Sequence, residues 1–240
     1  MTKELALSTS PPFTNSYQDS HPQRVIEMFP VKIGSYTFPY KDKTRLKQIC
    51  FIIIDKYKNN REYTTQNPDS GYLTHYFDPY LNINSSLLDY PGFETFNSWI
   101  KRCSIDYINN TLGYDCDNVV ITQCWINDCS KGGSQPPHNH TNSLISGTYY
   151  VNFIPAMHAP LIFIKPKIEC KPYLELERNN TACSNDSYAS VQQYEGNLLL
   201  WESHNIHAYK TNNTDNRISI SFNVIPETLP GMYGFKLIKK

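Results

Sequence analysis

The chain has 240 residues, 40% of them hydrophobic, which is enough for one substantial core. With 22 basic and 22 acidic residues the formal net charge is zero, so charge gives no reason to expect binding to nucleic acid or to an anionic membrane. No apolar run approaches the roughly eighteen residues of a membrane span, and residues 1–15 do not resemble a signal peptide, so we expect a cytoplasmic protein.

The first part of the chain carries few strand signals. Residues 1–28 lack hydrophobic periodicity and predict a flexible arm, and residues 29–40 look extended. Apolar residues then recur at helical spacing, which predicts an amphipathic helix over 44–59. The aromatic, turn-rich stretch 71–91 permits no assignment.

A second helix is predicted before the chain changes character. Apolar residues follow helical spacing over 94–112, and Gly113 is typical of the position just past a helix end. These segments predict a helical elaboration over 29–115, packed on the remainder of the chain within a single domain.

Short β runs separated by turn residues follow Tyr114. The predicted strands cover 118–127, 145–153, 161–165, 196–201 and 217–225. Such a succession is typical of a sandwich, barrel or jelly roll preceded by helices, hence of a mainly β protein. The polar segment 166–193 is expected to form a long loop over the mouth of the barrel.

The seven cysteines form no CxxC pair and are odd in number. Neither a zinc knuckle nor a closed disulfide framework is therefore indicated. We expect mostly reduced, partly buried thiols.

Four of the seven histidines fall in two tight clusters, His138-Asn-His140 and His204-Asn-Ile-His207. In an extended strand residues i and i+2 point to the same face, so His138 and His140 can present their imidazoles to one point in space. This is metal-ligand geometry. The alternative is an exposed loop that holds two incidental histidines beside two prolines.

Each cluster stands in a glycine frame similar to the two signature motifs of the cupin superfamily. Gly132 precedes the first pair by five intervening residues, and Gly196 precedes Glu202 by the same spacing, with His207 further on. The glutamate and the proline that complete the cupin motifs are missing. The likeness implies a double-stranded β-helix, a cupin-like jelly roll, over 116–240.

The final predicted strand alternates polar and apolar residues. Its polar face holds Arg217, Ser219, Ser221 and Asn223, while its apolar face is suited to packing. An arginine that points into a barrel is costly unless it meets an anion. A dicarboxylate supplies such an anion, because guanidinium binds carboxylate as a bidentate fork.

Here the sequence resembles the iron(II)/2-oxoglutarate oxygenases. His207 is followed ten residues later by Arg217-Ile-Ser219, the spacing and motif with which that superfamily holds the 5-carboxylate of 2-oxoglutarate. The segment 138–151, with Trp125-Ile-Asn127 upstream, is similar to a family of such oxygenases found in bacteria and phages. The resemblance implies Fe(II), 2-oxoglutarate and O2 as reactants, and hydroxylation of a substrate with succinate and carbon dioxide as co-products.

The chain departs from that superfamily at one ligand. The usual triad is His-x-Asp/Glu and a distal histidine, a face that suits iron(II). This sequence has His138-x-His140 instead, and Asn142 rather than a carboxylate two residues later. We therefore expect His138, His140 and His207 to bind the metal. The alternative is that one of the first pair is no ligand and that a carboxylate from Asp128 or Glu202 replaces it.

Other residues have weaker signals. Tyr150 shares the parity of the histidine pair and is a candidate contact of the co-substrate, as is Asn127, although a slip in register would turn Tyr149 inward instead. His204 is expected to be a structural residue or a supporting neighbour of the metal site. The isolated histidines, His21, His75 and His158, are interpreted as surface residues.

Two other functions are compatible with these patterns. One is a cupin-type dioxygenase or isomerase that uses the same histidines without 2-oxoglutarate, and the other is a non-catalytic jelly-roll binding protein. Arg217 and Ser219 argue against the first. The substrate, a small molecule or a peptidyl group, is not encoded in any pattern, and a homodimer is one option for the assembly.

Overall fold

The computed structural model describes residues 30–67, 70–81, 85–165, 188–229 and 234–236. Its contacts divide the chain into residues 1–31 and residues 32–240. The arm predicted over 1–28 and most of the loop predicted over 166–193 lie outside the described residues. The elements below belong to the second of the two units.

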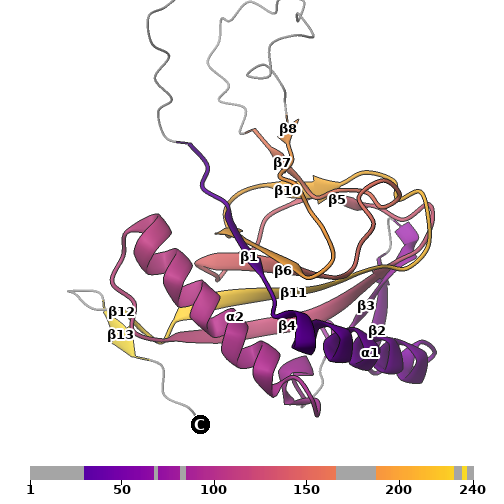
Figure 1. The fold of residues 1–240 in the computed structure, drawn as a ribbon, viewed down its shortest axis with the longest axis horizontal. Coiled ribbons are helices and arrows are strands. Elements are labelled where there is room, and N and C mark those ends of the chain that lie inside the picture. Colours follow the sequence, from indigo (N-terminus) through magenta and orange to yellow (C-terminus); the bar gives the residue numbers. More distant parts are fainter. Residues whose placement is uncertain (1–29, 68–69, 82–84, 166–187, 230–233, 237–240) are drawn as a thin grey trace, which may run out of the picture. The chain divides into compact units, whose positions relative to one another are not determined.

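Two antiparallel sheets form the framework (Figure 1). The larger sheet has the order β1-β9-β6-β11-β4-β3-β2, and the smaller one has the order β5-β10-β7-β8. In chain order the strands are β1 (Gly34–Thr37), β2 (Thr64–Asn67), β3 (Ser70–Tyr76), β4 (Val119–Cys129), β5 (Gln135–His138), β6 (Ile145–Asn152), β7 (Ile162–Ile164), β8 (Tyr188–Ala189), β9 (Asn197–Glu202), β10 (His207–Tyr209) and β11 (Arg217–Pro226), followed by the separate pair β12 (Thr228–Leu229) and β13 (Phe235–Lys236).

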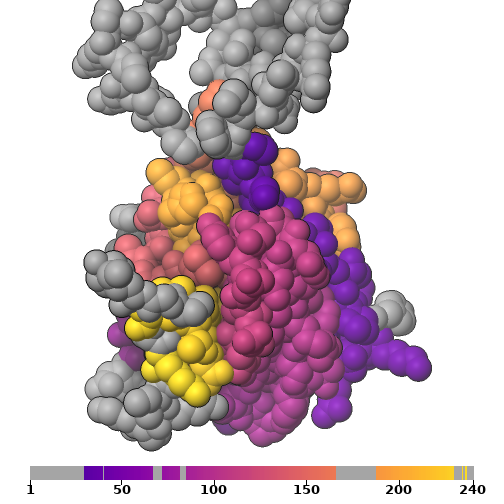
Figure 2. All heavy atoms as spheres, turned by 90° about the vertical axis from the view of Figure 1, so that its left-hand side faces the viewer, coloured from indigo at the N-terminus to yellow at the C-terminus, as the bar shows by residue number. Residues whose placement is uncertain are grey.

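Two helices pack against the larger sheet. The first, α1 (Tyr40–Tyr57), begins directly after Pro39, four residues earlier than predicted. The second, α2 (Glu94–Asp106), continues as a π-helical turn (Tyr107–Leu112) and ends at Gly113 with φ +81°, as the sequence predicted. A short 3-10 turn (Leu87–Asp89) precedes it. Figure 2 shows the outer surface of α2, in magenta, beside the yellow strands β12 and β13.

The strand β11 has side chains that alternate between the two faces of the larger sheet. Its apolar side chains from Ile218 to Val224 belong to the main core cluster, together with residues of α1 and α2. Its polar side chains, Arg217, Ser219 and Ser221, line a cavity on the opposite face. Across that face Tyr150 and Trp201 of the larger sheet pack on Phe163 of the smaller one. The alternation predicted for this strand is confirmed.

The helix-covered face of the larger sheet leaves no room for a side chain at Gly147. A Cβ there would lie 2.4 Å from Phe222 Cζ and 2.7 Å from Leu200 Cδ2. We expect Gly147→Ala to lower the free energy of unfolding by about 1–3 kcal/mol, because the overpacked core must shift. Urea denaturation measures this. The double variant Gly147→Ala/Phe222→Leu should recover part of the loss; purely additive effects would contradict the steric explanation.

The described residues include five of the seven cysteines and all of the helices named above. The five cysteines among them, Cys50, Cys103, Cys116, Cys124 and Cys129, are free and buried, as predicted, whereas Cys170 and Cys183 lie outside the described residues. In the part of the chain that the structure describes, no helix has the length and apolar character needed to cross a membrane.

Candidate metal centre

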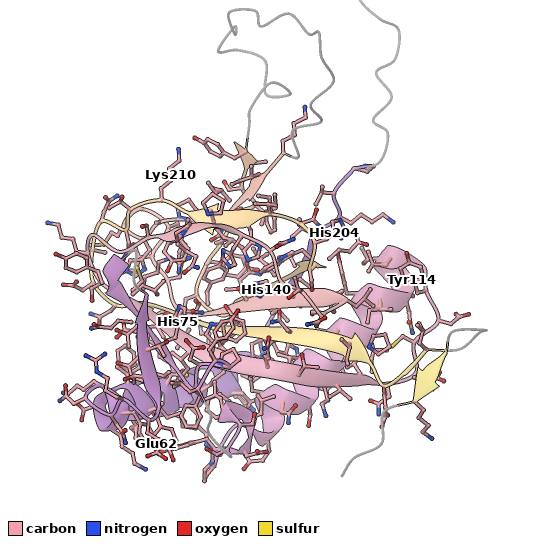
Figure 3. The ribbon with its side chains drawn as sticks, turned by 180° about the vertical axis from the view of Figure 1, so that it is seen from behind. Glu62, His75, Tyr114, His140, His204 and Lys210 are labelled. Carbon is pink, nitrogen blue, oxygen red and sulfur yellow. The ribbon has the colours of Figure 1, made fainter. Side chains whose placement is uncertain are left out.

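Three histidines converge between the sheets. His138 ends β5 and His207 begins β10, and these two residues are direct partners across the strand pair. The backbone N–H of His140, two residues further on, donates to the Ser203 carbonyl at 3.0 Å. The potential ligand atoms of the three side chains lie within 4.8 Å of one another. Figure 3 shows His140 between the two sheets.

Hydrogen bonds orient two of the three rings. Nδ1 of His138 donates to the Pro136 carbonyl at 2.8 Å, and Nδ1 of His207 donates to the Asn205 carbonyl at 3.0 Å. A carbonyl oxygen only accepts, so Nδ1 carries the proton in each ring and Nε2 keeps its lone pair. Metal-binding histidines are commonly oriented in this way.

The distance between ligand nitrogens fits a metal ion. Nε2 of His140 lies 3.3 Å from Nε2 of His207. Metal–nitrogen bonds of about 2.1 Å at angles between about 90° and 109° place two ligand nitrogens about 3.0–3.4 Å apart. The donor set is therefore suited to a bound divalent metal.

The surroundings keep these imidazoles neutral. Burial lowers the pKa of His207 to about 3 and that of His140 to about 4, and the neighbouring His138 adds to both shifts. Burial likewise lowers the pKa of His138. Neutral imidazole is the form that binds a metal.

Neither carboxylate named as an alternative ligand reaches the cluster. Asp128 pairs across the strands with Ile218, and Glu202 pairs with Ile145, and both partners belong to the core on the helix-covered face. Directly paired residues share a face of a sheet, so both carboxylates point away from the histidines. Among the described residues, the candidate metal group consists of histidines alone.

The burial of Asp128 has a consequence for stability. Burial raises the pKa of this carboxyl to about 6, and Asp215 contributes. The protonated form therefore stabilises the fold below the unfolded pKa, and this contribution is lost as the pH rises through about 6. We expect Asp128→Asn to raise the free energy of unfolding by about 2 kcal/mol near pH 8 and to change little near pH 4.

Denaturation of the wild type and of Asp128→Asn between about pH 4 and pH 8 tests the prediction. The exposed Asp115 provides a matched control, since its replacement by asparagine removes the same charge without relieving burial. A gain for Asp128→Asn that is as large at pH 4 as at pH 8 would contradict the electrostatic cause.

Arg217 lies in the same cavity and is only 1% exposed. Its Nε donates to the Ala159 carbonyl at 2.8 Å, and its Cζ lies 4.0 Å above the centre of the Tyr209 ring. The N–H of Ala159 donates to Asn212 Oδ1 at 3.0 Å, so both backbone polar groups of Ala159 are hydrogen-bonded. Among the described residues no carboxylate pairs with the guanidinium.

The other predicted site residues lie around Arg217. Ser219 and Asn127 line the cavity, and Asn127 Nδ2 donates to Ser219 at 3.3 Å and to Ser221 at 2.9 Å. Tyr150 lies on the cavity side, with its ring 5.9 Å from the Arg217 Cζ and its hydroxyl without a partner among the described residues. Tyr149 packs on the helix-covered face, so the alternative register is wrong.

The cavity that joins these groups measures about 490 Å³, including its open mouth. Its aromatic walls include Trp125 and Trp201, and Trp201 packs edge-on against His207 at 4.8 Å between ring centres. The two sheets thus bring the histidines, Arg217 and Ser219 to one space.

Two of the histidines predicted to lie on the surface, His75 and His158, do not lie there. His158 is buried, with Nδ1 accepting from the Ile154 N–H and Nε2 donating to the Asp215 carbonyl. His75 is only 19% exposed and lines the cavity. His204 is exposed and outside the cluster, which contradicts a supporting role, and His21 lies outside the described residues.

A family model matches the part of the chain that holds the histidine cluster and Arg217. Residues 123–223, which contain the three histidines and Arg217, match the model of the family described as "Putative 2OG-Fe(II) oxygenase". No curated protein sequence matches the chain.

Solved structures share the fold at low identity. AviO1 from Streptomyces viridochromogenes Tue57 is 11% identical, with a TM-score of 0.58 over 84% of this chain and 92% of that one. HygX from Streptomyces hygroscopicus, solved with nickel, 2-oxoglutarate and hygromycin B, is 12% identical, with a TM-score of 0.53 over 82% and 83%. The epimerase SnoN, solved with Fe3+, alpha ketoglutarate and nogalamycin RO, is 10% identical, with a TM-score of 0.55 over 87% and 90%.

Two facing antiparallel sheets with a histidine cluster between them define a metal-binding jelly roll, and the predicted double-stranded β-helix is confirmed. The family match is narrower. Residues 123–223 match the 2OG-Fe(II) oxygenases, oxidoreductases that depend on iron(II) and 2-oxoglutarate.

Proposed function

We propose that His138, His140 and His207 bind the iron, that Arg217 and Ser219 hold the distal carboxylate of 2-oxoglutarate, and that the enzyme hydroxylates its substrate. The observation that carries this assignment is the guanidinium of Arg217, which is buried without a carboxylate partner among the described residues. A buried unpaired charge is costly, and a dicarboxylate removes that cost.

The surrounding residues orient the arginine. The Ala159 carbonyl holds Nε, and the Tyr209 ring covers one face of the guanidinium, so the fork is fixed for a carboxylate that approaches in the plane. Ser219 offers a hydroxyl from the same strand, and Asn127 fixes that hydroxyl. Tyr150 has an unpartnered hydroxyl beside the arginine and is our candidate for a further contact.

The three neutral imidazoles supply lone pairs to the iron. Bound iron and 2-oxoglutarate supply the oxidising power, with dioxygen as oxidant and succinate and carbon dioxide as co-products. The chain itself orients the reactants and excludes water, since the buried rings of Trp125, Trp201 and Tyr209 form part of the cavity wall.

Titration of the anaerobic iron(II) protein with 2-oxoglutarate tests the assignment. We expect a visible charge-transfer band that saturates with the co-substrate, because chelation places the keto acid on the metal. A protein that binds iron but develops no such band would contradict the proposal.

Hydroxylation needs its own test, because SnoN is described as an epimerase. Turnover under 18O2 in the presence of the substrate should place one labelled oxygen in the product. A product of unchanged mass would assign a different oxidative outcome to the same site.

Other expectations from the sequence stay predictions. They are the division into an arm (1–28), a helical part (29–115) and a catalytic core (116–240), the cytoplasmic location, and a small-molecule or peptidyl substrate. Size measurement in solution distinguishes a homodimer from a monomer.

A further inference from the structure

A second polar group faces the cavity from β3. Nδ1 of His75 lies 3.2 Å from Oδ2 of Asp78, which also accepts a hydrogen bond from Thr65, and Oδ1 of Asp78 accepts from the backbone N–H of Tyr80 at 2.9 Å. Asp78 is 4% exposed. Its carboxylate thus has three donors, one of which is the imidazole.

Asp78 is held in its ionised form. Burial alone would raise the pKa of this carboxyl, but the hydrogen bonds from His75, Thr65 and Tyr80 outweigh burial and lower the pKa. An ionised carboxylate only accepts, so Nδ1 of His75 carries a proton. In the imidazolium form the pair is neutral overall, and Nε2 becomes a second donor.

Nε2 of His75 is buried and has no hydrogen-bond partner among the described residues, although His75 lines the cavity that holds the histidine cluster. Buried polar atoms are normally paired, so an orphan at a cavity wall indicates a ligand.

The register places His75 on the cavity side of the sheet. His75 pairs with Asn127 of β4, which pairs with Ser219 of β11, so the three residues form one row across the sheet. Neighbouring strands are about 4.8 Å apart, which puts His75 about 10 Å from the row position of Ser219. The imidazole therefore lies beyond the residues proposed for the co-substrate.

The charge of the loaded cavity favours an anion. A divalent metal and Arg217 contribute three positive charges and 2-oxoglutarate contributes two negative ones, which leaves one positive charge. A carboxylate ligand would cancel it, but this cluster has a third histidine instead. None of the described residues that line the cavity is acidic.

We propose that His75, held by Asp78 and Thr65, forms an anion-binding subsite that takes a carboxylate group of the primary substrate. This deepens the proposed function and rests on it. The substrate class is then a carboxylic acid, with the acid group directed to β3 and the oxidised carbon near the histidine cluster.

Acetate serves as the probe, and acetamide is its neutral isostere. In zinc-substituted protein loaded with 2-oxoglutarate, long-range 1H–15N spectra report the Nε2 resonance of His75. We expect a saturable shift with acetate and none with acetamide. Asp78→Asn should weaken acetate binding about tenfold, because a charge-assisted hydrogen bond loses its supporting carboxylate.

His75→Gln should abolish the acetate site, as measured by calorimetry, while His204→Gln, an exposed histidine outside the cluster, should leave it unchanged. If His75→Gln does not fold, Asp78→Asn and Thr65→Val still test the subsite, since both retain the imidazole. Acetate binding of equal strength in all variants, equal binding of acetamide, or no acetate binding in the wild type would overturn the proposal.

A second arm identifies the source of the carboxylate. The affinity of the iron(II) protein for 2-oxoglutarate shows which carboxylate the subsite takes. If His75→Gln leaves this affinity unchanged, the subsite serves the substrate. If that affinity falls and 2-oxoglutarate excludes acetate, the subsite serves the keto acid, and the substrate assignment is overturned.

The two proposals can fail separately. A wild type that binds no 2-oxoglutarate refutes the proposed function, while acetate titration of the zinc protein without co-substrate still tests His75. A wild type that binds 2-oxoglutarate but shows no acetate site that depends on His75 refutes only the further inference.

Discussion

Replacing Arg217 with methionine is expected to weaken 2-oxoglutarate binding at least about thirtyfold, because loss of one partner of a buried charge pair costs about 2–5 kcal/mol. Methionine approximates the length of the arginine stem, so packing against Tyr209 is largely retained. Anaerobic titration of the iron(II) protein measures the affinity. In the wild type, co-substrate at a hundred times its Kd should add about 2.7 kcal/mol of stability, and the variant should lose this gain.

The same substitution should cost the ligand-free protein little stability. It leaves the Ala159 carbonyl without its donor, but it also removes a buried guanidinium that has no carboxylate partner among the described residues. Arg102→Met, on the exposed surface of α2, is the matched control and should bind 2-oxoglutarate normally. Unchanged affinity in Arg217→Met would refute the role given to Arg217.

The regular strands were predictable from the sequence, and the irregular ones were not. Strict alternation identified β11 and both of its faces. The strand β5 was missed because it contains two prolines, which are tolerated since it is the edge of the smaller sheet. The strands β2 and β3 lie in or near the aromatic stretch 71–91, where pairing with β4 rather than local pattern fixes the strand.

Site residues were predictable where their spacing is local. Parity and the ten-residue interval linked His207 with Arg217, and the structure brings both to one cavity. The supports of Arg217 were not predictable, since Ala159 lies 58 residues away and a backbone carbonyl has no sequence signature. His75 was missed for a similar reason, because its importance depends on a neighbouring strand and on the cavity beyond it.

His140 stands where a carboxylate is usual in this type of metal site. Substitutions of His140 distinguish a site of three histidines from a site of two histidines and one carboxylate. We expect His140→Ala to weaken iron(II) binding more than about a hundredfold, beyond the effect of losing an outer contact. His140→Asp should retain much of the affinity, because a carboxylate completes a two-histidine, one-carboxylate face suited to iron(II). Calorimetry with iron(II) under anaerobic conditions measures both.

Cobalt(II) spectra of the same variants count the ligands independently of affinity. Asn223 Nδ2 lies 3.4 Å from His140 Nδ1, so this amide is within reach of a new carboxylate, and Asn223→Ala serves as the control for a change in ring support alone. If His140→Ala binds iron within about threefold of the wild type, His140 is no ligand. A site of two histidines and water would then keep the charge surplus that favours an anion at His75, whereas a carboxylate ligand would cancel it.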